Sequence, residues 1–191
     1  MVVEGETGGL NQHDVESAFM ALHPKVERCI VDGMDRIGAL GGTFKVSMKI
    51  DPDGTAHSVF LSESNLGDRD TESCILELIR AKTWPRPLGG DGLAEHEFAV
   101  DALEPAAELD SDELRPAMRS IRRKVHPCVR RVRGRFVATM YISRNGQVRG
   151  AGIAPPSAAG EERADCVAEA LRKFNFGRQG SRLSKVTIAL P

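Results

Sequence analysis

Residues 42–54 read GTFKVSMKIDPDG, a run that alternates apolar and polar side chains and then ends in turn residues. The apolar members are Phe44, Val46, Met48 and Ile50. Strict alternation is typical of a half-buried β-strand, and Asp-Pro-Asp-Gly is typical of a tight turn between two strands. The stretch therefore predicts the first strand of a β-hairpin and its turn.

The same pattern returns 92 residues later in the chain. Five residues recur without a gap: Phe44, Met48, Ile50, Gly54 and Cys74 reappear as Phe136, Met140, Ile142, Gly146 and Cys166. Upstream the frame moves to 99, where Val15, Ala18, Phe19, Leu22, Val26 and Cys29 meet Leu114, Ala117, Met118, Ile121, Val125 and Cys128. We interpret the chain as two diverged tandem copies of one unit, the second shortened between its first helix and first strand.

Each copy is predicted to contain helix, strand, strand, helix and strand in that order. Apolar residues from Val15 to Val26 have the spacing of one helix face, which Pro24 is expected to kink or split. A second helix is expected to begin at Asp68 or Asp70 and run to Trp84, where prolines follow. Alternation over residues 95–100 and 186–190 predicts a last strand in each copy. The expected fold class is therefore α+β, with a small antiparallel sheet in each unit.

The two predicted units differ in charge. Residues 1–103 form the first copy, residues 104–113 an acidic linker that contains a proline, and residues 114–191 the second copy. Residues 1–105 hold 9 Lys+Arg and 19 Asp+Glu, a net charge of −10, whereas residues 106–191 hold 17 and 8, a net charge of +9. The copies are thus electrostatically complementary, although the whole chain carries only −1.

Four cysteines fall as one pair per copy, Cys29 with Cys74 and Cys128 with Cys166, with one member on each predicted helix. If both helices lie on the same face of the sheet, each pair can form a disulfide, which would add about 4 kcal/mol of stability. Two alternatives stay open: free thiols that fill core positions, and a zinc site. We expect no metal, because the cysteines lack CxxC spacing and the five histidines do not cluster in the sequence.

Motifs of catalysis and of membrane insertion are missing from the sequence. It contains no GxSxG, no P-loop, no GxGxxG after a strand and no HExxH, so we expect neither an enzyme nor a bound cofactor. No stretch approaches the roughly 20 apolar residues of a membrane-spanning helix. The start, Met1 to Gln12, is polar and rich in glycine, and we expect no export signal in it.

A basic run in the second copy supports a second function class, the binding of a polyanion or nucleic acid. Its members could follow a phosphate backbone: Arg122, Arg123, Lys124, Arg130, Arg131, Arg133 and Arg135. Few aromatic residues accompany them, so platforms for base stacking are not evident. The alternative is a solvated helix face whose positive charge also balances the negative charge of the acidic first copy. We therefore rank nucleic-acid binding second among the proposed functions.

The first copy resembles the C-terminal domain of TonB-type energy transducers. The resemblance rests on residues 42–54, on Ser62-Glu63-Ser64 and on Thr83-Trp84-Pro85. It is closer still to the TonB-like domains of the AgmX/PglI type in gliding-motility and cell-envelope proteins, which also pair a cysteine of each helix, here Cys29 and Cys74. The second copy matches at residues 135–146 and Asp165-Cys166, but has Phe174-Asn175-Phe176-Gly177 in place of the Trp-Pro ending.

The resemblance implies a non-catalytic coupling module of the periplasm, or of another extracytoplasmic space, that binds an envelope protein or an extended peptide. TonB proteins lend an edge strand to a partner's extended segment, and an exposed edge offers unpaired backbone groups for this purpose. The candidate edges are Glu95–Val100 and Ser184–Leu190. The residues expected to line them are Glu95, Glu97, Phe98, Ser184, Val186 and Ile188.

Overall fold

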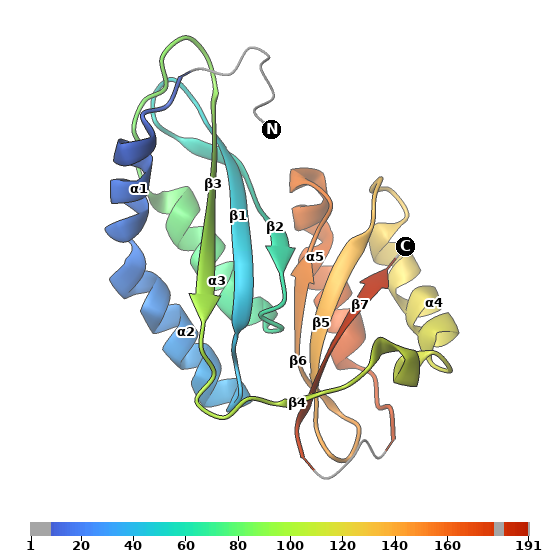
Figure 1. Cartoon of the computed structure of the whole chain (residues 1–191). Helices are drawn as coiled ribbons and strands as arrows, with labels where there is room; N and C mark the ends of the chain where they lie inside the picture. Colours follow the sequence, from blue (N-terminus) through green and yellow to red (C-terminus); the bar gives the residue numbers. More distant parts are fainter. Residues whose placement is uncertain (1–8, 178–181, 191) are drawn as a thin grey trace.

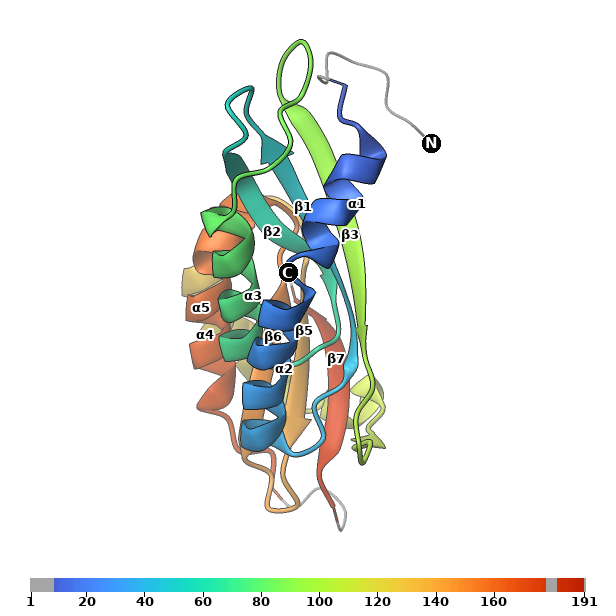
Figure 2. The same ribbon diagram turned by 90° about the vertical axis from the view of Figure 1, so that its left-hand side faces the viewer.

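The computed structural model describes residues 9–177 and 182–190, which form two β-sheets with helices packed against them (Figure 1). The elements are α1 (Gln12–Met20), α2 (His23–Ile37), β1 (Gly42–Ile50), β2 (Ala56–Ser64), α3 (Arg69–Ala81), β3 (Gly92–Val100), β4 (Ala107–Glu108), η1 (Ser111–Leu114), α4 (Met118–Val129), β5 (Phe136–Ile142), β6 (Val148–Ala154), α5 (Ala158–Arg172) and β7 (Ser184–Leu190). The strand orders are β2-β1-β3 and β4-β7-β5-β6. Figure 2 shows α3, α4 and α5 together on one side of the strands. The α+β fold class is therefore confirmed.

The first predicted helix is split into α1 and α2. Asn11 caps α1 by accepting hydrogen bonds from the N–H groups of His13 and Asp14. Pro24 lies in the first turn of α2, where its missing N–H is not needed by the helix. Of the two outcomes that Pro24 predicted, a kink or a split, the chain therefore adopts the split.

The second helix of the first half, α3, begins where the sequence predicts and ends earlier. The side chain of Asp68 accepts from the N–H of Thr71 and caps the helix. The helix ends at Ala81, and Trp84 folds back instead. The Trp84 backbone N–H donates to the carbonyl of Gly54 at 2.8 Å, and its indole N–H donates to Ile79 at 3.0 Å. Trp84 thus ties the end of α3 to the hairpin turn.

The first and last strands of each half pair in the same register. Seven pairings of β5 with β7, Phe136 with Leu190 through Ile142 with Ser184, repeat the pairings of β1 with β3, Phe44 with Phe98 through Ile50 with Gly92, at an offset of 92 residues. The bond from Trp84 to Gly54 also recurs, because the N–H of Phe176 donates to Gly146 at 2.9 Å. Common descent of the halves stays a prediction from the sequence.

Both expected cysteine pairs are disulfides, Cys29–Cys74 between α2 and α3 and Cys128–Cys166 between α4 and α5. None of the four cysteines is free, so the alternatives of buried thiols and of zinc-bound thiolates do not apply. Two disulfides fit a protein of an oxidising, extracytoplasmic compartment. Within residues 9–177 and 182–190, no helix combines the length and apolar character needed to cross a membrane.

Two separate hydrophobic cores form, one in each half. Tyr141 is the exception, since it lies on β5 but packs into the core of the first half. Its hydroxyl accepts from the N–H of Gly41 at 3.1 Å and lies 3.2 Å from the Gly41 carbonyl oxygen. Burial raises the pKa of this phenol. Tyr141 therefore connects the second half to the core of the first half next to Gly41, the residue that precedes β1.

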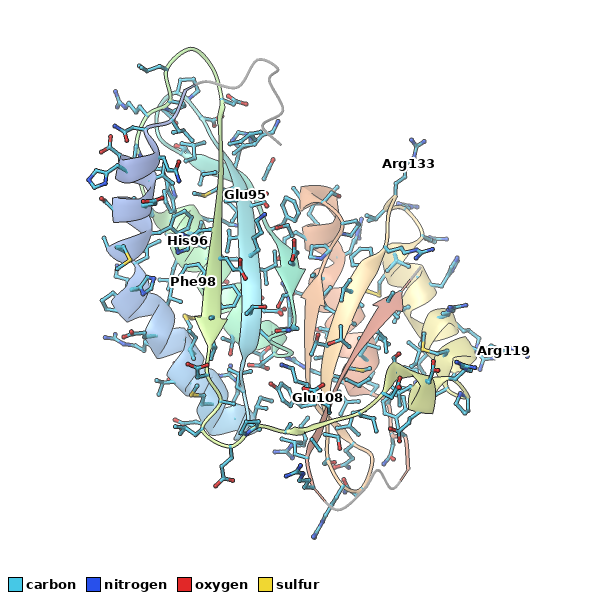
Figure 3. All side chains as sticks on the ribbon, viewed as in Figure 1. Glu95, His96, Phe98, Glu108, Arg119 and Arg133 are labelled. Carbon is cyan, nitrogen blue, oxygen red and sulfur yellow. A yellow bond between two sulfur atoms is a disulfide. The ribbon has the colours of Figure 1, made fainter. Side chains whose placement is uncertain are left out.

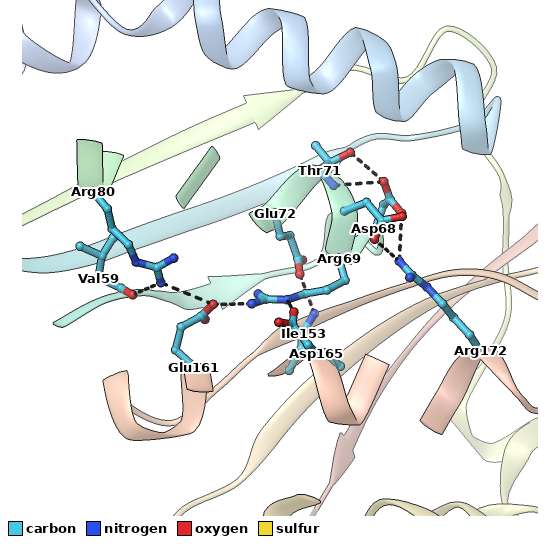
Figure 4. A network of polar contacts seen from close by, with 11 residues as sticks. Val59, Asp68, Arg69, Thr71, Glu72, Arg80, Ile153, Glu161, Asp165 and Arg172 are labelled. Atoms are coloured by element: carbon cyan, nitrogen blue, oxygen red, sulfur yellow. Dashed lines mark hydrogen bonds and ion pairs between the residues drawn. The ribbon is translucent and has the colours of Figure 1, made fainter. Parts of the chain in front are cut away.

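An ion-pair network with a buried centre also joins the halves (Figure 4). The guanidinium of Arg69, at the start of α3, contacts Glu161 at 2.5 Å and Asp165 at 2.7 Å, both on α5. Arg172 of α5 reaches back to Asp70 of α3 at 3.0 Å. The side chains of Arg69 and Glu161 are only 7% and 6% exposed, so this pair is removed from water. Helices α3 and α5 therefore lock the two sheets side by side.

Glu72 of α3 completes the junction by binding the backbone of β6. Its carboxylate accepts from the Ile153 N–H at 2.8 Å and from the Ser64 hydroxyl at 2.7 Å. Gly152 permits this approach, because a Cβ there would collide with the Glu72 carboxylate and with Gly67. An N–H at the side of β6 that faces the first half is thus satisfied by a side chain rather than by another strand.

The predicted linker, residues 104–113, is partly built into the second sheet. Within it, β4 pairs in parallel with the start of β7. The Ala107 N–H donates to Leu183 at 3.0 Å, and the Leu109 N–H donates to Lys185 at 2.8 Å. This pairing could not be predicted from the sequence, because a two-residue strand is too short for an alternating pattern.

Removal of the second disulfide should destabilise the chain. The bridge closes a loop of 38 residues, for which the chain-entropy relation gives about 4 kcal/mol. We expect the double substitution Cys128→Ala and Cys166→Ala to lower the free energy of unfolding in urea by about this amount. The pair Cys29→Ala and Cys74→Ala should cost nearly the same, since the dependence on loop length is logarithmic. Unchanged stability in both variants would contradict the prediction.

Glu72 should make stability depend on pH. Burial raises its pKa from 4.5 to about 7, against the opposing effect of its hydrogen bonds. The folded chain then binds a proton that the unfolded chain has lost, so the free energy of unfolding should fall as pH rises from about 4.5 to about 7, and level off above. The expected fall in the free energy of unfolding is on the order of 3 kcal/mol.

Glu72→Gln should reduce this fall, because the amide does not titrate. The matched control is Glu77→Gln, an exposed position on the same helix, which should leave the pH profile unchanged. Urea unfolding at several pH values measures the free energy of unfolding of both variants. An unaltered slope in Glu72→Gln would assign the pH dependence to other groups.

Candidate functional site

The outer strand of the first sheet, β3, has one open edge. It pairs with β1 through all nine residues in an unbroken register, and no other strand of the described chain pairs with it. Proteins commonly protect such edges with a proline, a bulge or a very short strand. β3 has none of these three features; its protection is limited to the charged side chains of Glu95 and Glu97 and to α1 beside it. Its unpaired backbone N–H and C=O groups can therefore accept another strand.

A groove runs between this strand and α1, which lies beside β3 in both views (Figures 1 and 2). Its volume is about 420 Å³. The lining residues are Gly9, Leu10, Gln12, Val15, Glu16, Phe19, Leu93, Ala94, Glu95 and His96. Leu93 is 53% exposed at this site, although its side chain is large and apolar. The groove can thus receive an apolar side chain next to the open edge.

The floor of the groove is aromatic. The ring of Phe19 stacks on His96 with centroids 4.3 Å apart, and Phe19 also contacts Trp84 at 4.6 Å. Burial lowers the pKa of His96, so the imidazole is neutral at pH 7. Phe19 is itself fully buried, so these rings support the groove from beneath, and a ligand group in the groove meets the neutral His96 and the apolar Leu10 between the acidic Glu16 and Glu95.

The outward face of β3 is acidic. Glu95 binds Lys45 at 2.6 Å and Ser47 at 2.7 Å, and the hydrogen bond from Lys45 lowers the pKa of its carboxyl group. Glu97 and, on α1, Glu16 are exposed as well. A ligand with basic side chains therefore complements this rim.

The side chains predicted to line the β3 edge differ in their placement (Figure 3). Glu95 and Glu97 are exposed as the alternation predicts. Phe98 instead points into the core, where its ring stacks on Phe44 with centroids 4.9 Å apart. It therefore offers a partner its backbone and not its side chain.

The second predicted edge, on β7, is less open. The side chains of Ser184, Val186 and Ile188 are all buried. The first two residues of β7 already pair with β4, so the chain's own linker occupies the beginning of this edge. We therefore take β3 as the main candidate site.

The sequence did not reveal the groove or the part of α1 in it. The one indication in the sequence is Leu93, an apolar residue that shares the outward face of β3 with the charged Glu95 and Glu97. Other large exposed apolar side chains of the described residues also lie in the first half: Met20, Val31, Leu88 and Leu103. Isolated exposed leucines are common, so this signal is weak without the structure.

A basic face covers α4 and the connection to β5. It is formed by exposed residues: Arg119, Arg122, Arg123, Lys124, Arg130, Arg131, Arg133 and Arg135. Figure 3 labels Arg119 and Arg133 at the end of the molecule away from β3. None of the eight forms an ion pair within residues 9–177 and 182–190. The acidic half is thus not the ionic partner of this face.

One group of metal-ligating side chains occurs among the described residues: Asp51, His57 and Asp91, whose ligand atoms lie within 4.8 Å of one another. The imidazole lies between the two carboxylates, with Nδ1 3.1 Å from Asp51 and Nε2 3.9 Å from Asp91. Both ring nitrogens therefore face acids. The group supplies no basis for assigning a metal centre.

Comparisons with known proteins leave the site to be judged on its own geometry. No protein-family model, curated protein or solved structure matches the chain.

Proposed function

We propose that this chain is a non-catalytic interaction module of the cell envelope that binds an extended segment of a partner protein by strand addition to β3. The open nine-residue edge of β3 carries the proposal. Strand addition uses the backbone of the edge for affinity and neighbouring pockets for specificity. The groove under α1 provides such a pocket directly beside the strand.

The chemistry of the site favours a particular class of segment. Its apolar side chains would enter the groove on the face of β3 that carries Ala94 and His96, and its basic side chains would lie beside Glu97 on the opposite face. Because side chains of a strand alternate between two faces, one extended segment can meet both demands. The partner segment is therefore extended, with apolar and basic residues in alternation.

The same proposal places the chain in the periplasm or another extracytoplasmic space, as a coupling module of the TonB-like type. Two disulfides support an oxidising compartment. The resemblance of residues 42–54 and 83–85 to TonB-type energy transducers, and to the TonB-like domains of gliding-motility proteins, supports the coupling role. The partner on this proposal is another envelope protein.

Selection of peptides tests the binding mode. A display library of random extended peptides should be screened against the full oxidised chain, and the best binder mapped by amide hydrogen exchange. We expect slower exchange in β3 when the peptide is bound, since its free N–H groups become hydrogen bonded. Leu93→Ser should weaken binding by about tenfold, because an apolar contact worth about 1.4 kcal/mol is lost and no charge is added that could attract the basic residues of the segment.

The control is Leu103→Ser, which alters an exposed leucine that does not line the groove. It should leave affinity unchanged. Protection that appears only outside β3, or equal losses in both variants, would refute strand addition at this edge.

A further inference from the structure

We propose that the basic face of α4 and of the connection to β5 docks the protein on an anionic membrane surface by electrostatic attraction. The inference concerns a surface remote from β3 and does not depend on the function proposed above. It commits to one occupant, a layer of anionic lipid headgroups.

The basic face lies in a stretch of chain without acids. From Leu114 to Gly160 the sequence holds 11 Lys+Arg and no Asp or Glu. Arg115, at the start of this stretch, pairs with Asp112 just before it, whereas the residues of the basic face have no ion-pair partner in the described structure. The positive potential around α4 is left for an external anion.

The helix holds these charges on one side. Arg119, Arg122, Arg123 and Arg130 follow the spacing of one helix face, over about 16 Å. The opposite side of α4 is buried through Ile121 and Val125, and the disulfide of Cys128 fixes the helix to α5. The basic face is therefore a rigid surface.

The residues that surround the arginines of the basic face indicate what kind of partner it can bind. The large exposed apolar side chains among the described residues all lie in the first half and none on the basic face. Arginine is common in protein–protein interfaces, but there it surrounds an apolar centre, and the basic face has no large exposed apolar side chain to form one. A layer of anionic headgroups needs only charge, at about 1 kcal/mol per basic residue.

The basic face is less suited to single-stranded nucleic acid than to lipid headgroups, because proteins that bind single strands use exposed aromatic rings on which the bases stack. The nearby rings of Phe174 and Phe176 stack on each other with centroids 5.6 Å apart. The Lys124 ammonium also lies over Phe174, 5.0 Å from the ring centroid. Both contacts occupy ring faces on which a base would stack.

Vesicle binding tests the proposal with the full oxidised chain. We expect the protein to co-sediment at low salt with phosphatidylcholine vesicles that contain about 40% phosphatidylglycerol, and not with pure phosphatidylcholine. Salt at about 0.5 M should release it, because screening is strong at that concentration. The triple variant Arg119→Glu, Arg122→Glu and Arg123→Glu should bind at least about 100-fold more weakly.

The matched control makes the same change in net charge elsewhere. Lys25→Glu, Arg28→Glu and Lys49→Glu alter three exposed residues of the first half, and this variant should bind vesicles like the unaltered chain. Equal losses in both variants would show a mere net-charge effect and overturn the proposal. So would failure of the unaltered chain to bind, or tighter binding to a single-stranded oligonucleotide than to vesicles at the same salt.

Discussion

The relative placement of the two halves depends on the guanidinium of Arg69, which α3 inserts between Glu161 and Asp165 of α5. An ion pair removed from water brings a large desolvation cost, and loss of one partner typically destabilises a protein by about 3–5 kcal/mol because the other charge stays buried. Two further contacts between the halves depend on this placement: the Glu72 carboxylate accepts from the Ile153 N–H, and the Tyr141 hydroxyl accepts from the Gly41 N–H. All three contacts require the same alignment of the halves.

This junction decides which strands stay open. It turns β2 and β6 toward each other and places α3 against β6 and α5 against β2, so the inner edges are covered. β3 and β7 are left at the outer sides, and β4 covers the beginning of β7. One long open edge lies at the acidic end of the molecule, and the basic face lies at the other end (Figure 3). The two candidate sites are thus separated by the whole width of both sheets.

Local rules explain what the sequence could predict. Alternation from Phe44 to Ile50, the turn at Gly54 and the cysteine pairs act over short distances or at matching places in both halves, and the structure agrees with them. The junction could not be predicted in this way. Arg69 and Glu161 are separated by the repeat distance of 92 residues. Glu161 is typical of a solvated first helical turn, where the helix dipole favours anions, and Arg69 is not, but neither segment indicates that the two residues pair. Burial of Glu72 depends on a glycine in a distant strand, which no pattern within α3 indicates.

The position of the disulfides has a mechanical consequence. Cys29–Cys74 and Cys128–Cys166 enclose the hairpins of β1 with β2 and of β5 with β6, whereas β3 and β7 lie outside the bridged loops. Tension applied to the two ends of the chain passes through the bridges and bypasses loops of 45 and 38 residues, so about 290 Å of chain cannot be drawn out. The load falls instead on β3, β7 and the non-covalent junction. The strand that offers an open edge to a partner is therefore one of those that carry the force.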